Sequence, residues 1–467
     1  MPGNRSDRPR VAVVGAGVAG LTAAWELTNR VGDRVDVTVF EGAPQLGGKL
    51  RVSEVAGIPV DEGAESMLAR RPEGVELVRA LGAAGDLVEP ATTSASIWVG
   101  DDLVPMPKGH VMGIPADVDA VAGSGLFSAD TVDRVAQEPQ LPGRPLTDDV
   151  AVGDYVTSRL GAEVVDRLVE PLLAGVYAGR ADALSLPATL PQLAPLLRTD
   201  GSLVAAARRV VAQAPSATGP GFVSLRGGMG RLPQLLAERS GARIRTSAMV
   251  RELCESTDGW WLTVGPAREP EQVRADAVVL AVPARPASRL LAQIAPAAAT
   301  ELGAVEYASM ALVTLVYPAS AVPGRLGSGF LVPASAGRTI KAATAMSQKW
   351  PQVAADGLAV VRCSVGRYGE ERTLQVADGT LVQQAVTDLA AAGIAEPPVA
   401  SRVTRWGGAL PQYVVGHLAR VEKALAAVAE HDRLAVCGAA YGGVGVPACV
   451  ASGRAAADRV LGALGHA

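Results

Sequence analysis

The fold is decided by residues 11–20, Val11-Ala12-Val13-Val14-Gly15-Ala16-Gly17-Val18-Ala19-Gly20. The valine-rich run predicts a buried parallel strand, and the residues from Leu21 to Arg30 predict a helix. Between them the glycines stand at the spacing G-x-G-x-x-G. In this pattern Gly15 permits a tight turn, Gly17 lets a pyrophosphate approach the backbone, and Gly20 lets helix and strand pack closely. The free N–H groups at the helix start favour phosphate.

A second strand supports this interpretation. Val35 to Phe40 is again short and apolar, and Glu41 follows it directly. A carboxylate at this position accepts hydrogen bonds from ribose hydroxyls. Strand, glycines, helix, strand and acid in this order predict a dinucleotide site at Gly15, Ala16, Gly17, Val18, Ala19, Gly20 and Glu41.

A further group of glycines indicates which dinucleotide is bound. Gly42 follows Glu41, and Gly47-Gly48-Lys49 comes shortly after. A site for NAD does not need this second pair, whereas the arrangement resembles the extended fingerprint of FAD enzymes, where the pair lies near the phosphates. The alternative is an ordinary Gly-Gly turn.

Composition excludes several other classes. The chain has 467 residues, enough for two or three domains, and its 43 basic and 47 acidic residues give no reason to expect nucleic acid. The cysteines form no C-x-x-C pair, which is typical of reduced thiols in the cytoplasm, and no histidines stand at metal-ligand spacing. The uncharged run from Leu434 to Gly453 has the length of a membrane span. Its glycines and Pro447 favour a turn instead, so at most peripheral membrane contact is expected.

The pattern along the chain predicts a discontinuous nucleotide-binding domain. A hairpin is expected within 91–107, a largely helical stretch within 154–173, and several antiparallel strands within 305–370. The run from Leu434 predicts another buried strand, followed by a glycine-rich loop and a helix opened by Pro447. We expect the nucleotide-binding domain at 9–90, 221–290 and 401–467, a second domain with the antiparallel strands at 91–110 and 291–400, and a helical domain at 111–220.

Several motifs together resemble one family. They are Met106–Gly109 with Met112–Pro115, Glu170–Gly179, Pro411–Tyr413 with Gly416-His417, and Gly438–Arg454. With the N-terminal fingerprint, they make the chain similar to the HemY-type protoporphyrinogen/coproporphyrinogen oxidases, and most of all to the coproporphyrinogen III oxidases of Gram-positive bacteria.

The resemblance implies a fold and an activity. The fold is α/β, with a Rossmann-like FAD-binding domain of the amine-oxidase type, a mixed α/β substrate domain and a helical insertion. The activity is the FAD-dependent oxidation of coproporphyrinogen III to coproporphyrin III in haem biosynthesis, with oxygen as acceptor and release of hydrogen peroxide. Removal of six electrons takes three flavin cycles, with the flavin N5 as hydride acceptor and no catalytic side chain. A ferrochelatase that receives the product is an implied partner.

The resemblance also implies which residues contact FAD. Ala64 and Glu65 depart from the family pattern, which commonly has Pro and Asp at these positions. The resemblance therefore implies a backbone contact here more than a contact from the side chain of residue 65. Val250 and Trp406 have alternatives, a plain strand residue and a packed core aromatic. The implied contacts are Gly15, Ala16, Gly17, Val18, Ala19, Gly20, Glu41, Gly42, Gly47, Gly48, Lys49, Gly63, Ala64, Glu65, Ser66, Val250, Trp406, Gly438, Gly445, Val446 and Pro447.

A porphyrinogen carries propionates, so cations are expected around it. Arg70 and Arg71 match a basic pair of the family, and Arg71 is the stronger candidate. Lys341 and Lys349 are weaker candidates, for which surface positions are an alternative. Tyr177 and His417 lie in family motifs and are interpreted as structural.

Three other functions remain open on the sequence. The first is protoporphyrinogen IX oxidase, whose substrate has two vinyls in place of two propionates. The second is an amine oxidase or carotenoid desaturase, although the aromatic content of 4% offers few rings for an amine. The third is a non-catalytic flavin-bearing porphyrin carrier.

Overall fold

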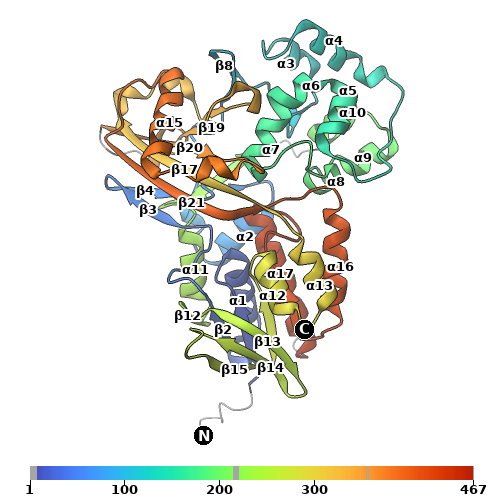
Figure 1. Cartoon of the computed structure of the whole chain (residues 1–467), viewed down its shortest axis with the longest axis vertical. Helices are drawn as coiled ribbons and strands as arrows, with labels where there is room; N and C mark the ends of the chain where they lie inside the picture. Colours follow the sequence, from blue (N-terminus) through green and yellow to red (C-terminus); the bar gives the residue numbers. More distant parts are fainter. Residues whose placement is uncertain (1–7, 214–219, 354, 356, 466–467) are drawn as a thin grey trace.

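A five-stranded parallel sheet forms the centre of the lower half of the molecule in Figure 1. The structure is a computed structural model that describes residues 8–213, 220–353, 355 and 357–465. The strands are, in spatial order, β12 (Arg243–Arg245), β2 (Asp36–Phe40), β1 (Arg10–Val14), β16 (Ala277–Leu280) and β22 (Leu434–Val436).

The alternation of side chains along β1 builds a core on each face of this sheet. Val11 and Val13 face one layer, whereas Ala12 and Val14 face the other. The first layer is made of helices α1 (Val18–Val31), α11 (Arg231–Arg239) and α17 (Val446–Ala463). The second is made of the antiparallel strands β13 (Val250–Ser256), β14 (Gly259–Val264) and β15 (Glu271–Ala275) with helices α12 (Ala284–Leu291), α13 (Pro296–Gly303) and α16 (His417–Ala429).

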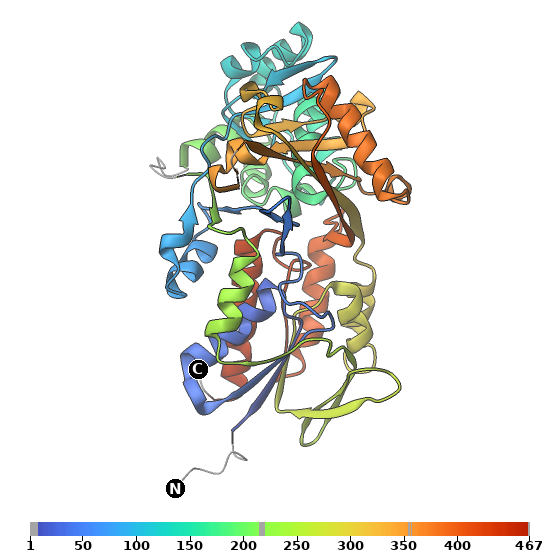
Figure 2. The same ribbon diagram turned by 90° about the vertical axis from the view of Figure 1, so that its left-hand side faces the viewer.

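A seven-stranded sheet, here called the substrate sheet, lies in the upper half (Figures 1 and 2). Its strands pair antiparallel except for the contact between β18 and β7. Helix α15 (Asp378–Ala391) packs on one face. The order is β21 (Ala400–Pro411), β17 (Tyr307–Pro318), β20 (Leu358–Val365), β19 (Ile340–Ala345), β18 (Gly329–Leu331), β7 (Ala95–Val99) and β8 (Asp102–Pro105). The predicted hairpin within 91–107 is therefore confirmed.

Short elements join the two halves. The hairpin β3 (Val52–Val55) and β4 (Ile58–Asp61) packs against the substrate sheet beside helix α14 (Met346–Lys349). A small sheet and helix α2 follow along the chain. They comprise β5 (Met67–Leu68), α2 (Pro72–Ala80), β6 (Leu87–Val88) and β11 (Phe222–Leu225).

The helical region adjoins the substrate sheet at the upper right of Figure 1. The stretch 154–173, expected as one helical run, is divided because Gly161 has a φ of 95° and ends a helix there. The short pair β9 (His110–Val111) and β10 (Ile114–Pro115) opens this region. Its helices are α3 (Val118–Ala122), α4 (Ala129–Gln137), α5 (Val152–Leu160), α6 (Ala162–Val164), a π-helical turn at Val165–Val169, α7 (Glu170–Tyr177), α8 (Leu186–Thr189), α9 (Ala194–Thr199) and α10 (Leu203–Gln213).

Two predicted domain boundaries are wrong. The boundary at 400/401 cuts off β21, which pairs with β17 in the substrate sheet. The boundary at 290/291 separates α13 from the core of the nucleotide-binding domain, in which α13 packs. The run from Leu434 is a strand, a loop and the first turns of α17, and none of the described helices is both long and apolar enough to cross a membrane.

Candidate FAD site

The glycine loop after β1 has the geometry that its spacing predicts. A Cβ on Gly15 would lie 2.5 Å from the carbonyl oxygen of Ala281, and a Cβ on Gly20 would lie 2.1 Å from that of Gly15. A Cβ on Gly17 would meet nothing within 4 Å. Helix α1 starts here without a side-chain cap, so no capping side chain occupies its first N–H groups.

Glu41 is tied to this loop. Its carboxylate accepts hydrogen bonds from the backbone N–H of Ala16 at 2.8 Å and from that of Ala43 at 2.8 Å. The neighbouring chain segment before β13 lies alongside, because Ala248 donates to the carbonyl of Glu41 at 2.7 Å. Val250 itself points into the core, so it can reach a cofactor through its backbone alone.

The second glycine pair lies directly against the first motif. Gly47 donates to the carbonyl of Ala16 at 2.8 Å, and a Cβ on Gly48 would stand 3.4 Å from Gly17 Cα. Burial lowers the pKa of Lys49, and the nearby Cys449 partly offsets this. Within the described ranges, burial and Cys449 are the causes of this pKa shift, and no carboxylate contributes to it.

A second helix start lies at the other end of the chain. Helix α17 begins after Gly445 without a side-chain cap, and Val446 and Pro447 are buried in its first turn. Tyr413 holds the loop before it, because its hydroxyl donates to the carbonyl of Ala439 at 2.6 Å and accepts from the N–H of Gly443 at 2.9 Å. Two helix starts therefore offer partial positive charge.

Residues 61–66, here called the acidic segment, begin at the last residue of β4 and are held by cations of β20 and α14. The Glu65 side chain is buried, and its carboxylate accepts from Lys349 Nζ at 2.6 Å and pairs with Arg362. Burial alone would raise the pKa of Glu65, but the charges of Arg362 and Lys349 outweigh it and lower the pKa to about 2. The Glu65 carboxylate is therefore ionised and fully engaged within the protein.

Trp406 joins the acidic segment from β21. Its indole N–H donates to the carbonyl of Glu62 at 2.5 Å, and the Arg51 guanidinium lies 4.5 Å from its ring centroid. The Glu62 carboxylate accepts from Arg402 Nε at 2.8 Å. Trp406 is thus half-buried and hydrogen-bonded to the acidic segment, and it is not a residue of the hydrophobic core.

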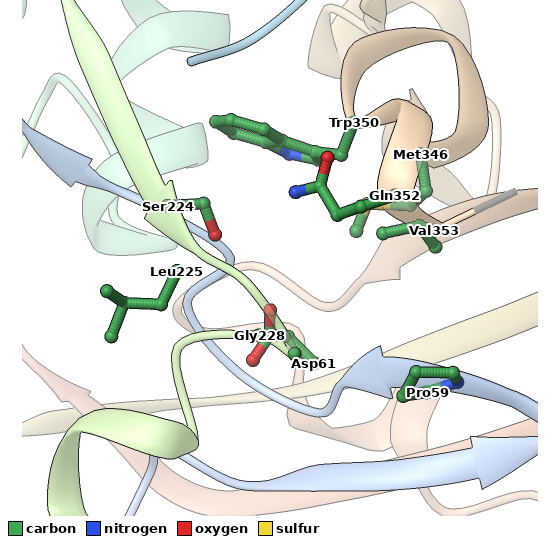
Figure 3. Close-up of a pocket in the computed structure, with 10 residues that line it drawn as sticks. Pro59, Asp61, Ser224, Leu225, Gly228, Met346, Trp350, Gln352 and Val353 are labelled. Atoms are coloured by element: carbon green, nitrogen blue, oxygen red, sulfur yellow. The ribbon is translucent and has the colours of Figure 1, made fainter. Parts of the chain in front are cut away.

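A small cavity lies behind the acidic segment (Figure 3). Its volume of about 20 Å³ fits one water molecule and excludes a porphyrin. The Asp61 carboxylate faces it and accepts from the N–H of Gly230 at 3.3 Å, while Trp350 borders the other side. Burial raises the pKa of Asp61 to about 7, although the Arg362 charge opposes this.

The site as a whole fits a dinucleotide with two phosphates. Among the described residues it offers two helix starts without side-chain caps, open space at the Cβ position of Gly17, and Lys49, whose pKa no carboxylate shifts; all of these suit an anion. The structure brings together the glycine loop, Glu41 and the Gly47-Gly48 pair. Gly438, whose N–H donates to Ser452 Oγ at 2.9 Å, lies in the loop that precedes α17.

The predicted substrate cations fall into two groups. Arg70 and Arg71 are exposed just beyond the acidic segment, and Arg71 donates to Glu73 through Nη2 at 2.8 Å. The surface alternative for Lys341 is wrong, because that residue is only 2% exposed and its Nζ donates to the carbonyl of Gly366 at 2.7 Å. Burial and the charge of Arg367 lower the pKa of Lys341 to about 7. Lys349 is engaged with Glu65 instead.

Tyr177 and His417 are both buried, as the structural interpretation requires. The His417 ring stacks on Tyr413 with centroids 3.9 Å apart, and burial lowers the pKa of His417 to about 4.

Sequence reasoning missed Arg362, Arg402 and Asp61. One signal was present: Arg362 is the single charged residue in β20, on the same strand face as Val360 and Ser364. A lone charge in an otherwise apolar strand indicates a buried partner.

Residues 18–461 match the family of flavin containing amine oxidoreductases, so the chain belongs to this family. Within it, the chain is 38% identical to the coproporphyrinogen III oxidase of Mycobacterium tuberculosis over 97% of both chains. It is 30% identical to the coproporphyrinogen III oxidase of Bacillus subtilis over 97% of this chain and 98% of the relative. A crystal structure of a candidate protoporphyrinogen oxidase from Exiguobacterium sp. 255-15 has a TM-score of 0.85 at 32% identity, covering 97% of this chain and 98% of that one.

These comparisons confirm the predicted fold class and the predicted cofactor. The chain is an oxidoreductase that uses FAD.

Proposed function

We propose that this protein oxidises coproporphyrinogen III to coproporphyrin III with oxygen and releases hydrogen peroxide. The observation that carries the proposal is the similarity to coproporphyrinogen III oxidases over nearly the whole chain, combined with a site that fits FAD. When bound, FAD takes two electrons at a time from the macrocycle, so three cycles complete one porphyrin.

The chain's own residues bind and orient the cofactor. The glycine loop, Gly47-Gly48 and Lys49 would hold the phosphates, Glu41 the ribose, and the start of α17 the opposite side. The acidic segment would lie between the cofactor and the substrate sheet, and Trp406 would face the cofactor from β21 of that sheet. The full set is Gly15, Ala16, Gly17, Val18, Ala19, Gly20, Glu41, Gly42, Gly47, Gly48, Lys49, Gly63, Ala64, Glu65, Ser66, Val250, Trp406, Gly438, Gly445, Val446 and Pro447.

Arg71 is the proposed contact for a substrate propionate. It is exposed at the N-terminal end of α2, five residues beyond the acidic segment in the numbering. Glu73 already holds the guanidinium in a two-pronged contact, which is the geometry that a propionate would take over. Arg70 is a second, less constrained candidate. Lys341 would require its bond to Gly366 to open.

A comparison of substrates separates the candidate functions. Catalytic efficiency is measured with coproporphyrinogen III and with protoporphyrinogen IX, each corrected for autoxidation. We expect the higher value for coproporphyrinogen III, and a clear preference for protoporphyrinogen IX would overturn the choice of substrate. Turnover of amines without porphyrinogen turnover would favour an amine oxidase.

Product handling is tested in the same assay. We expect hydrogen peroxide to accumulate with porphyrin, and porphyrin release without peroxide would favour a non-catalytic carrier. Addition of a ferrochelatase should shorten the lifetime of free coproporphyrin if that enzyme receives the product.

A further inference from the structure

One arginine of the substrate sheet makes three contacts with the acidic segment. Arg362 Nη1 donates to the carbonyl oxygens of Asp61 at 2.9 Å and of Gly63 at 3.0 Å. Its Nη2 pairs with the carboxylate of Glu65. The guanidinium therefore fixes the backbone on both sides of Glu62 and the side chain beyond it.

The contacts are shielded from water. The Arg362 side chain is 10% exposed and that of Glu65 is 8% exposed. Trp350 Nε1 approaches the same carboxylate at 3.3 Å, so indole, ammonium and guanidinium groups surround it. Hydrogen bonds to charged groups are stronger than neutral ones, and more so where water is excluded.

These partners come from the opposite half of the molecule. Arg362 lies in β20, and Lys349 ends α14 beside the same sheet. On the other side, Ser224 Oγ donates to the carbonyl of Glu65 at 2.6 Å; Ser224 lies in β11, whose Val223 and Leu225 pack in the nucleotide-binding core. The acidic segment is thus held between the two halves, at the place where a cofactor and a sheet-bound substrate would have to meet.

We propose that Arg362 is a positioning residue that fixes the acidic segment relative to the substrate sheet and so sets the distance between cofactor and substrate. The proposal rests on the proposed function, because it takes Gly63 to Ser66 as contacts of FAD. A planar guanidinium can reach two carbonyls and a carboxylate at once, whereas the ammonium of lysine is a single point of charge. A lysine at position 362, which keeps the positive charge, should therefore not replace Arg362.

The same sheet provides a matched control on its other face. Arg405 of β21 donates to the carbonyls of Leu374 and Val376 and pairs with Asp378, at the start of α15. It thus combines two carbonyls and one carboxylate, as Arg362 does, but on the side turned away from the acidic segment.

The experiment compares Arg362→Lys with Arg405→Lys. Amide hydrogen exchange of residues 61–66 is measured in FAD-free protein, and FAD affinity is measured by titration. For Arg362→Lys we expect amide exchange of this segment to become about 10- to 100-fold faster and FAD affinity to fall by about the same factor. This is the size of effect expected from the loss of a charge-assisted hydrogen bond. For Arg405→Lys we expect neither change. In FAD-loaded Arg362→Lys, kcat should fall more than KM rises.

Equal exchange and equal FAD affinity in both variants would overturn the proposal and make Arg362 a purely structural residue. If Arg362→Lys does not fold, Glu65→Asp shortens the carboxylate while keeping its charge, and the same two readouts should move in the same direction by a smaller factor. Unchanged readouts there would also overturn it. A wild-type protein that binds no FAD would instead refute the proposed function, without affecting the exchange result.

Discussion

The glycine loop and the acidic segment are held in opposite ways. The glycine loop is set by its own backbone, through contacts of Gly15 and Gly20 that leave no room for a Cβ. The acidic segment is held by side chains from β20, β21 and α14. These partners lie far along the chain: Glu65 and Arg362 are 297 residues apart. The first can form with the nucleotide-binding domain alone, whereas the second requires the substrate sheet to dock.

This difference separates cofactor binding from cofactor placement. A side chain at Gly17 should remove FAD without harming the fold, because a Cβ at this position meets nothing within 4 Å. Damage to the acidic segment should harm the fold first, because its charges are buried and paired.

The largest expected effect concerns Gly17. The variant Gly17→Glu should retain no FAD, because the side chain would fill the place of the pyrophosphate, while the midpoint of thermal unfolding of the FAD-free protein stays unchanged. Gly85→Glu is the control, since Gly85 is exposed and also has nothing within 4 Å of its Cβ position. Flavin absorbance per protein is the measurement. Normal flavin content in Gly17→Glu would refute the position of the site.

The next effect depends on pH. The pKa of Glu65 is lowered from 4.5 to about 2, so its ion pairs stabilise the folded state above about pH 4.5, and this contribution is lost as pH falls towards 2. At pH 7, Glu65→Gln should lower the free energy of unfolding by about 3 kcal/mol, since it leaves buried cations unpaired. The difference from wild type should shrink towards pH 2.

Chemical denaturation at several pH values measures this difference. The control is Glu271→Gln, which removes the exposed pair with Arg245 and should cost less than about 1 kcal/mol. A difference for Glu65→Gln that stays constant between pH 7 and pH 2 would show that folding does not shift the pKa of this carboxylate, and would contradict stabilisation by its ion pairs.

One small substitution sharpens the comparison between the regions. Gly63→Ala would place a Cβ 1.9 Å from the carbonyl oxygen of Lys49, so the backbone must move, at a cost of about 1–3 kcal/mol. Gly17→Ala should leave the unfolding midpoint of the FAD-free protein unchanged. Thermal unfolding of both FAD-free variants gives the answer, and equal midpoints would contradict the difference in packing.

The smallest effect lies on the substrate side. Arg71→Ala should lower kcat/KM by about 10-fold, near the low end for a charge-assisted contact, because a propionate must displace Glu73. Glu73→Gln should act in the opposite direction and lower KM, since it frees the guanidinium. Both effects should shrink with a porphyrinogen esterified on its propionates. An equal loss on the ester would make Arg71 a surface residue.

The contrast between the glycine loop and the acidic segment also separates what could be predicted from the sequence from what could not. The glycine loop, Glu41 and the start of α17 belong to local patterns, and the strands and helices around them were predicted correctly because those patterns are read from neighbouring residues. Arg362 and Glu65 meet only through tertiary packing, so no local pattern pairs them. The membership of β21 in the substrate sheet was missed for the same reason, because the strand follows a helix and pairs with β17 far earlier in the chain.

The most direct test of the central claim mixes the purified flavoprotein with coproporphyrinogen III in the absence of oxygen. We expect the bound flavin to lose its oxidised absorbance and to regain it when oxygen is admitted. With oxygen present, we expect about three molecules of oxygen consumed per coproporphyrin formed, as two-electron cycles require. The claim would be contradicted if coproporphyrinogen III leaves the flavin oxidised while another candidate substrate, such as an amine, reduces it.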